Sequence, residues 1–218
     1  MTESTQNEYC YQQIHIDAAR NATDDFNLFH DSSKWDRIHI NPFGMPIVLG
    51  FQLEALIEYL VTLFRRKAGE DALIRDHNLQ YANYQFTFAD VVRPGEPVSV
   101  DIRKTVRRVQ EAGQIANRIV VRKAAGLVLI GFQRESVSPL CMPGLDIADV
   151  GDLDGCEDRS WVGGGRYFMK RKFLNTGNGK NFLAGSLVDQ HCYFDELENR
   201  VLFPAMFPVS LLSCALLE

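Results

Sequence analysis

An acid and an imidazole lie five residues apart in the segment Asp25-Phe-Asn-Leu-Phe-His30. Further along, Pro46-Ile-Val-Leu-Gly50-Phe leads into a long apolar stretch. Proton transfer beside a carbonyl needs a positioned base and acid, together with hydrogen-bond donors at the carbonyl oxygen. A glycine at the start of a helix offers unpaired N–H groups and lets an oxygen approach the backbone. These residue types could therefore act together on a carbonyl compound.

The spacing of the acid and the imidazole sets a condition on the backbone. In an unbroken α-helix, residues five apart point in directions that differ by about 140°. Asp25 and His30 can meet only if the chain breaks or turns between them. A plainer interpretation stays open, in which Asp25 is a first-turn helix carboxylate, His30 a partly buried histidine and Gly50 a close-packing glycine.

Hydrophobic periodicity predicts the elements that must position these residues. Residues 9–18 carry isoleucines in alternation, which predicts a first strand. Asn21 or Thr23 could then cap a short helix that holds Asp25 in its first turn. Residues 46–67 repeat apolar side chains at three- and four-residue steps over a broad face, which predicts a helix buried on most sides.

After this helix the hydrophobic period changes to two. The alternation predicts four antiparallel strands, at residues 84–88, 98–102, 115–123 and 127–134. A turn signal, Arg93-Pro-Gly-Glu, separates the first two of them. A curved antiparallel sheet wrapped around one long helix accounts for both the apolar helix and the alternating strands. The predicted fold class is α+β.

The last third of the chain is less regular. Prolines, aspartates and three consecutive glycines at residues 138–165 indicate a linker or excursion. Beyond it the pattern predicts a strand at 166–173 and helices at 180–192 and 208–218.

An internal repeat is also visible. Residues 43–58 can be laid on residues 203–218 through shared Phe, Ala, Leu and Glu positions. The second copy stops before its strands could form. The predicted organisation is a first domain at 8–137, a linker at 138–165 and a partial second unit at 166–218.

Composition narrows the function classes. The net charge of −5 gives no electrostatic reason to expect nucleic acid. The five cysteines are widely spaced without a Cys-x-x-Cys, which argues against a disulfide framework or a zinc site. His30, Asp31 and His39 lack metal-ligand spacing. With a polar N-terminus and no apolar run long enough for a membrane span, we predict a cytoplasmic protein without membrane partners.

The first 135 residues resemble the MaoC-like branch of the hotdog fold, which contains R-specific enoyl-CoA hydratases and related dehydratases. The family pattern is Asp-x-Asn-Pro-x-His followed by Pro-Ile-Ala-His-Gly-Met at the start of the central helix. Here Leu28 replaces the proline and Leu49 replaces the histidine before Gly50. The turn at 93–96 is similar to the Pro-Gly-Asp turn of such folds. The resemblance implies a hotdog fold, with a possible partial second hotdog unit at the C-terminus.

The resemblance also implies an activity. It is that of a lyase of fatty acid metabolism that interconverts 3-hydroxyacyl and trans-2-enoyl thioesters of coenzyme A or acyl carrier protein, without a cofactor. Asp25 and His30 would be catalytic. The N–H of Gly50, with Leu49, would bind the oxyanion, and Asn27 would belong to the substrate site. Such domains pair, so we expect a homodimer, or an internal pseudo-dimer that uses residues 160–218.

Other interpretations remain open. The replacements at Leu28 and Leu49 suit a non-catalytic acyl-binding or assembly domain, and related folds also include acyl thioesterases. His39 and Glu54 resemble the His and Glu of β-hydroxyacyl-carrier-protein dehydratases, although their fifteen-residue spacing is one longer than expected. The basic run 103–108 could contact coenzyme A phosphates or form a solvated strand face.

Overall fold

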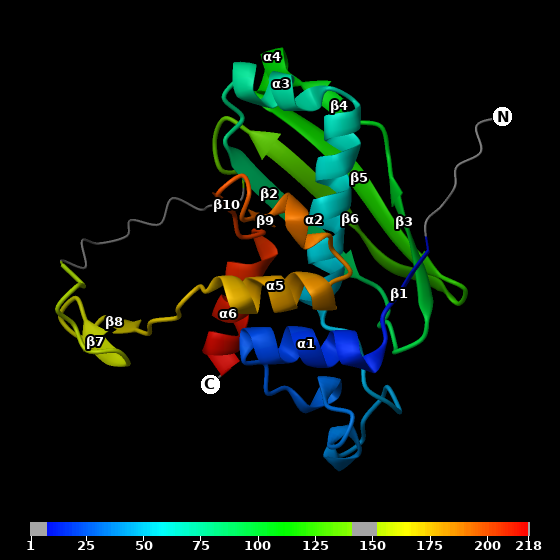
Figure 1. The fold of residues 1–218 in the computed structure, drawn as a ribbon, viewed down its shortest axis with the longest axis vertical. Helices are drawn as coiled ribbons and strands as arrows, with labels where there is room; N and C mark the ends of the chain where they lie inside the picture. Colours follow the sequence, from blue (N-terminus) through cyan, green and yellow to red (C-terminus); the bar gives the residue numbers. More distant parts are fainter. Residues whose placement is uncertain (1–7, 141–151, 218) are drawn as a thin grey trace.

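The computed structural model describes residues 8–140 and 152–217. Its main sheet curves along one side of a single long helix, α2 (Gly50–Lys67), as Figure 1 shows. The strands follow the order β1-β3-β5-β6-β2, with β4 added beside β5, and every pairing is antiparallel. Their bounds are β1 (Glu8–Cys10), β2 (Tyr81–Phe88), β3 (Pro97–Ile102), β4 (Val106–Arg108), β5 (Gln114–Lys123) and β6 (Gly126–Ser136). The predicted sheet around a helix is confirmed.

Burial of α2 follows from its wide apolar face. Leu53, Leu56, Ile57 and Val61 are at most 2% exposed, and they share one core with the inner side chains of the sheet. The helix begins at Gly50, whereas the apolar pattern predicted a start at residue 46. Two short helices follow elsewhere along the sheet, α3 (Glu70–Asp76) and α4 (Val109–Ala112).

The first predicted strand and the short helix after it are wrong. Strand β1 ends at Cys10, and the chain then forms helix α1 (Gln13–Thr23). The buried side chains of α1 are Ile16, Ala19 and Ala22, at helical spacing, while Ile14 is 68% exposed. The isoleucine alternation misled the prediction because the two alanines complete a period of three to four.

The C-terminal part adds helices to the same body. Helix α5 (Thr176–Gly185) packs against α1, and helix α6 (Met206–Leu217) packs against α2. Between them lie η3 (Gln190–Cys192) and the hairpin β9 (Phe194–Asp195) with β10 (Arg200–Val201). A second hairpin, β7 (Ser160–Val162) with β8 (Tyr167–Met169), precedes α5. The helix predicted at 180–192 therefore starts and ends earlier, and the strand predicted at 166–173 is shorter.

Polar contacts join these helices at the start of α2. The fully buried Gln52 side chain accepts the Leu49 N–H at 3.1 Å, and its amide donates to the carbonyls of His15 at 3.1 Å and Gly185 at 2.5 Å. One turn and a half later, the buried Glu58 carboxylate accepts the N–H groups of residues 205 and 206 at the start of α6. Each of the helices α1, α5 and α6 is thus tied to α2.

We expect Gln52→Met to lower the free energy of unfolding by about 3 kcal/mol, because it leaves two carbonyls and one N–H buried without their partner. Urea unfolding measures the loss. Gln110→Met, at an exposed position of α4, is the matched control and should change stability by less than about 0.5 kcal/mol. Equal urea midpoints for Gln52→Met and the unchanged protein would contradict the role given to this side chain.

Candidate active site

The segment that carries Asp25 and His30 is not a continuous helix. Helix α1 ends at Thr23, and Asp24 takes a left-handed conformation with φ of 54°. The Asp25 carboxylate accepts the Asn27 N–H at 2.8 Å, and the Asn27 side chain caps the 3-10 helix η1 (Leu28–His30) by accepting the Phe29 N–H at 3.1 Å. The break that the spacing required is therefore present.

This break brings the acid and the imidazole together. His30 Nε2 lies 3.7 Å from Asp25 Oδ2, and both side chains are largely shielded from solvent. On its other side, His30 Nδ1 is 2.8 Å from the Ile47 carbonyl oxygen. A neutral ring that donates its Nδ1–H to this carbonyl keeps an unprotonated Nε2 toward Asp25. A water molecule between His30 Nε2 and Asp25 Oδ2 could then donate its protons to these two atoms.

Burial sets the protonation of His30. Loss of solvent lowers the His30 pKa below its usual 6.5, and the Arg20 charge acts in the same direction. The hydrogen bond to Ile47 and the Asp25 charge oppose this shift without cancelling it. At neutral pH the imidazole is therefore uncharged, which is the form that a general base requires.

Arg20 holds the segment in place. Its Nε donates to the Asp25 carbonyl at 3.2 Å, and its guanidinium lies 3.2 Å from Asp31 Oδ2. Hydrogen bonds from Ser33, with the Arg20 charge, lower the Asp31 pKa to about 2. Sequence reasoning missed Arg20; its position in the last turn of a helix, just before two aspartates, was the available signal.

His30 lines a cavity at the start of α2, whereas Asp25 is not among the residues that line it. The cavity has a volume of about 420 Å³. Two of its lining residues are charged or titratable, His30 and Asp90, and the others are Gly50 and apolar residues: Phe43, Ile47, Val48, Leu53, Phe88, Ala89, Val91 and Val92. Gly50 is the first residue of α2, and its N–H makes no hydrogen bond to any residue that the structure describes. A helix start of this kind offers a donor with partial positive charge.

Not every predicted site residue reaches this cavity. The Leu49 N–H is already bonded to Gln52, so it is not available to an oxyanion. Asn27 shapes the loop through its cap and is absent from the cavity lining. Burial raises the Glu54 pKa to about 7, but His39 is exposed on its loop. Within residues 8–140 and 152–217, no group of His, Cys, Asp and Glu could hold a metal ion.

Comparisons with known proteins bear on the fold. No protein-family model and no curated protein matches this sequence. A MaoC-like dehydratase of known structure matches 94% of this chain and 73% of its own, with 14% identity and a TM-score of 0.50. A conserved hypothetical protein from Mycobacterium tuberculosis with a double hotdog fold matches 97% of this chain and 72% of its own, with 12% identity and a TM-score of 0.50. The chain has a hotdog fold.

The hotdog fold includes the C-terminal residues, since both matches extend into them. The predicted fold class, with a partial second unit, is confirmed; the limits 8–137, 138–165 and 166–218 stay a prediction. An (R)-hydratase from A. caviae, involved in PHA biosynthesis, matches 63% of this chain and all of its own, with 16% identity and a TM-score of 0.40.

No helix of this hotdog protein, over the described residues, is long and apolar enough to cross a membrane.

We expect His30 to titrate below pH 6.5, and Asp25→Asn to lower its pKa further, because the carboxylate charge favours the imidazolium. The folded pKa lies below the unfolded one, so this contribution to stability is fully present above pH 6.5 and is lost as the pH falls from 6.5 through the lower pKa of the folded protein. NMR titration of the ring measures both pKa values. Asp36→Asn, at an exposed carboxylate, is the control; a rise in the His30 pKa on removing Asp25 would refute the pairing.

Proposed function

We propose that the protein is a hydratase or dehydratase that interconverts 3-hydroxyacyl and trans-2-enoyl thioesters. The observation that carries the proposal is the approach of His30 Nε2 to Asp25 Oδ2 beside an apolar cavity at the start of α2. An acyl chain suits the apolar walls, and a thioester oxygen can reach the unbonded N–H of Gly50. The carrier is coenzyme A or acyl carrier protein, and the reaction belongs to fatty acid metabolism.

The proposed reaction is a balanced addition of water. Water bound between the two side chains gives a proton to His30 as its oxygen bonds to C3 of the enoyl thioester. The electron pair of the double bond moves toward the carbonyl, whose oxygen becomes an enolate held by the Gly50 N–H. Collapse of the enolate takes a proton from the pair onto C2 and yields the 3-hydroxyacyl thioester. Dehydration is the reverse.

We place the enzyme in the cytoplasm as a homodimer. Cys10, Cys156 and Cys192 form no disulfide with any described residue, as suits a reducing compartment. Strand β2 has one partner within the described residues, β6, so its other edge is available to a second copy.

A non-catalytic acyl-binding domain is the second candidate function. It is favoured because the Leu49 N–H is already bonded to Gln52, which leaves Gly50 as the one donor that we propose.

We expect Asp25→Asn and His30→Ala each to lower kcat/KM for hydration of crotonyl-CoA by about 10²- to 10⁴-fold, the usual contribution of a positioned acid or base. The loss of absorbance of the conjugated double bond gives the rate. Asp36→Asn should leave that rate unchanged. Full activity in both site variants would refute the assignment, and release of free thiol from saturated acyl-CoA would identify a thioesterase instead.

Gly50→Ala tests whether the space beside the proposed donor is needed. A Cβ at this position would lie 3.2 Å from the Phe88 ring, so Gly50→Ala pushes the ring into the cavity. We expect a loss in kcat/KM of about tenfold, or roughly 1.4 kcal/mol of barrier. Phe88 is 43% exposed, and adding Phe88→Leu should restore most of the rate by making room. A double variant as slow as Gly50→Ala alone would show that crowding is not the cause.

A further inference from the structure

One side of the cavity at the start of α2 consists of five consecutive residues, 88–92, and we call them the 88–92 wall. Phe88 is the last residue of β2, whereas residues 89–93 belong to no helix or strand. The N–H groups of residues 89 and 90 still reach the Val128 carbonyl of β6. Beyond them, contacts with other elements must set the path of the wall.

The ammonium group of Lys123 holds the middle of this wall. Lys123 is the last residue of β5, and its side chain is 3% exposed. Its Nζ donates to the Val91 carbonyl at 2.7 Å and to Glu96 Oε2 at 3.1 Å, and it lies 3.1 Å from Asp90 Oδ2. An ammonium group has three N–H donors, so these three oxygens can engage all of them.

The charges around Lys123 favour a fixed position. Arg93 Nη1 lies 3.5 Å from Glu96 Oε1, so two cations stand against two carboxylates. The Glu96 carboxylate also accepts the Arg93 N–H at 2.8 Å, in the turn that follows the wall. The hydrogen bond from Lys123 lowers the pKa of Asp90, which therefore stays ionised at neutral pH. Removing the ammonium group would leave both carboxylates and the carbonyl without this donor.

The wall is bonded in turn to the opposite side of the cavity. The Val92 carbonyl accepts the Val48 N–H at 2.8 Å, and Arg93 Nε donates to the Phe43 carbonyl at 3.3 Å. Val48 and Phe43 both line the cavity, and Val48 belongs to the chain that enters α2. Lys123 thus fixes one side of the cavity directly and is connected through it to the other.

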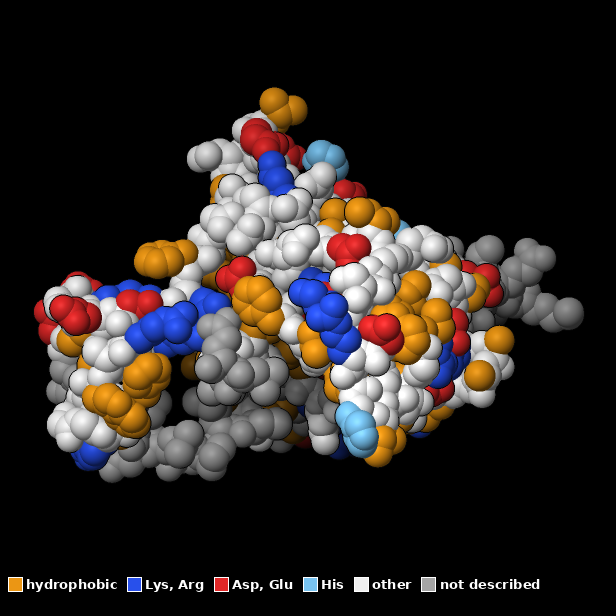
Figure 2. All heavy atoms as spheres, turned by 90° about the horizontal axis from the view of Figure 1, so that it is seen from below, with side chains coloured by type: hydrophobic (Ala, Val, Ile, Leu, Met, Phe, Trp, Pro, Cys, Tyr) orange, Lys and Arg blue, Asp and Glu red, His pale blue; other side chains and the backbone are white. Residues whose placement is uncertain are grey.

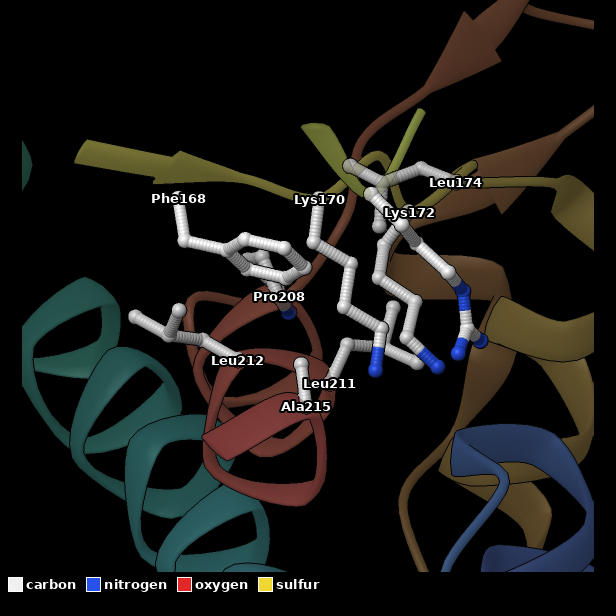
Figure 3. A pocket seen from close by; sticks show the side chains of 9 residues that line it. Phe168, Lys170, Lys172, Leu174, Pro208, Leu211, Leu212 and Ala215 are labelled. Carbon is white, nitrogen blue, oxygen red and sulfur yellow. The ribbon is translucent and has the colours of Figure 1, made fainter. Parts of the chain in front are cut away.

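A second cavity, of about 480 Å³, lies along α6. Figure 3 shows its two sides, which are alternate residues of the segment that begins in β8 and one face of α6. Figure 2 shows Lys and Arg side chains gathered where the β7–β8 hairpin, at the left, meets the helical body. The cations of this cavity already have interaction partners, such as Asp24 for Lys172. Neither His30 nor Gly50 lines it, so the acyl group of the proposed reaction belongs in the cavity at the start of α2.

We propose that Lys123 is a positioning residue that holds the 88–92 wall against the acyl chain, an inference that rests on the proposed function. Lys123 is absent from the cavity lining and therefore acts through the wall rather than on the substrate. A longer acyl chain contacts more of the wall than a short one, since each buried methylene adds to binding. Lys123 then determines how strongly the enzyme prefers longer acyl chains.

Lys123→Met tests this role through the ratio of two substrates. We expect kcat/KM for trans-2-hexenoyl-CoA to fall about tenfold more than kcat/KM for crotonyl-CoA, because the longer chain loses more contacts with the displaced wall. A smaller fraction of folded enzyme lowers both values equally, so the ratio does not report stability. Arg122→Met, at the exposed neighbouring position of β5, is the matched control and should keep the ratio of the unchanged protein. An unchanged or raised ratio in Lys123→Met would overturn the proposal, as would hydration of crotonyl-CoA alone by the unchanged protein.

Glu96→Gln is a milder variant that keeps the test open if Lys123→Met does not fold. Glu96 bonds to Lys123 and Arg93 but does not line the cavity. The substitution removes one charge and keeps the shape of the side chain, so the ratio should fall in the same direction by about threefold. A ratio equal to that of the unchanged protein would count against a role transmitted through the wall and would overturn the proposal.

Hydrogen exchange separates the wall from the proposed reaction. The Val48 N–H is bonded to the Val92 carbonyl, so Lys123→Met should speed its exchange about tenfold more than that of the β5 amides. Equal acceleration at Val48 and in β5 would show a global loss of stability and overturn the proposal. Faster exchange at Val48 in a protein without hydration activity would refute the proposed reaction and keep Lys123 as the residue that holds the wall. Hydration activity with unchanged exchange at Val48 would refute the role of Lys123 and keep the reaction.

Discussion

The structure depends on burying the start of α2. The first N–H groups of a helix have no partner within it, and a buried helix start must find partners for them elsewhere. Within the first turn, the Gln52 N–H bonds to the Leu49 carbonyl. The segment just before the helix is held by its own N–H groups: those of Ile47 and Val48 donate to the carbonyls of Phe29 and Val92, and that of Leu49 donates to the Gln52 side chain. The Gly50 N–H has no partner among the described residues, and Gly50 lines the cavity, so it is the donor that we propose for a carbonyl oxygen.

The same contacts fix the imidazole. The Ile47 N–H donates to the Phe29 carbonyl in η1, and the Ile47 carbonyl oxygen accepts from His30 Nδ1. The chain entering α2 therefore positions both the proposed base and the proposed donor. Leu49 lies where the MaoC-like pattern has a histidine. Its side chain is 2% exposed, and its backbone N–H donates to the Gln52 side chain.

Much of this could be predicted from the sequence, and the limits have physical causes. The strands and α2 have clear hydrophobic periodicity in the sequence, so they could be predicted. Helix geometry alone showed that Asp25 and His30 can meet only if the chain breaks between them. Helix α1 was missed because alanines make up half of its buried stripe and read as neutral beside two isoleucines. Arg20 was missed together with helix α1, which carries it, although its partners Asp25 and Asp31 lie near it in the chain. The Leu49 N–H bonds to the Gln52 side chain three residues on, but that side chain is held by the carbonyls of His15 and Gly185, which are distant in the chain.

The contacts around α2 also bear on how the chain folds. Gln52 bonds to Gly185, 133 residues away, and Glu58 to residue 205, 147 residues away. Closing loops of this length costs conformational entropy before the contact can stabilise the chain. We therefore expect contacts between residues this far apart in sequence to form late. The sheet can assemble from neighbouring strands much earlier. During synthesis, the part of α2 that packs against α5 and α6 therefore stays uncovered until those two helices have been made.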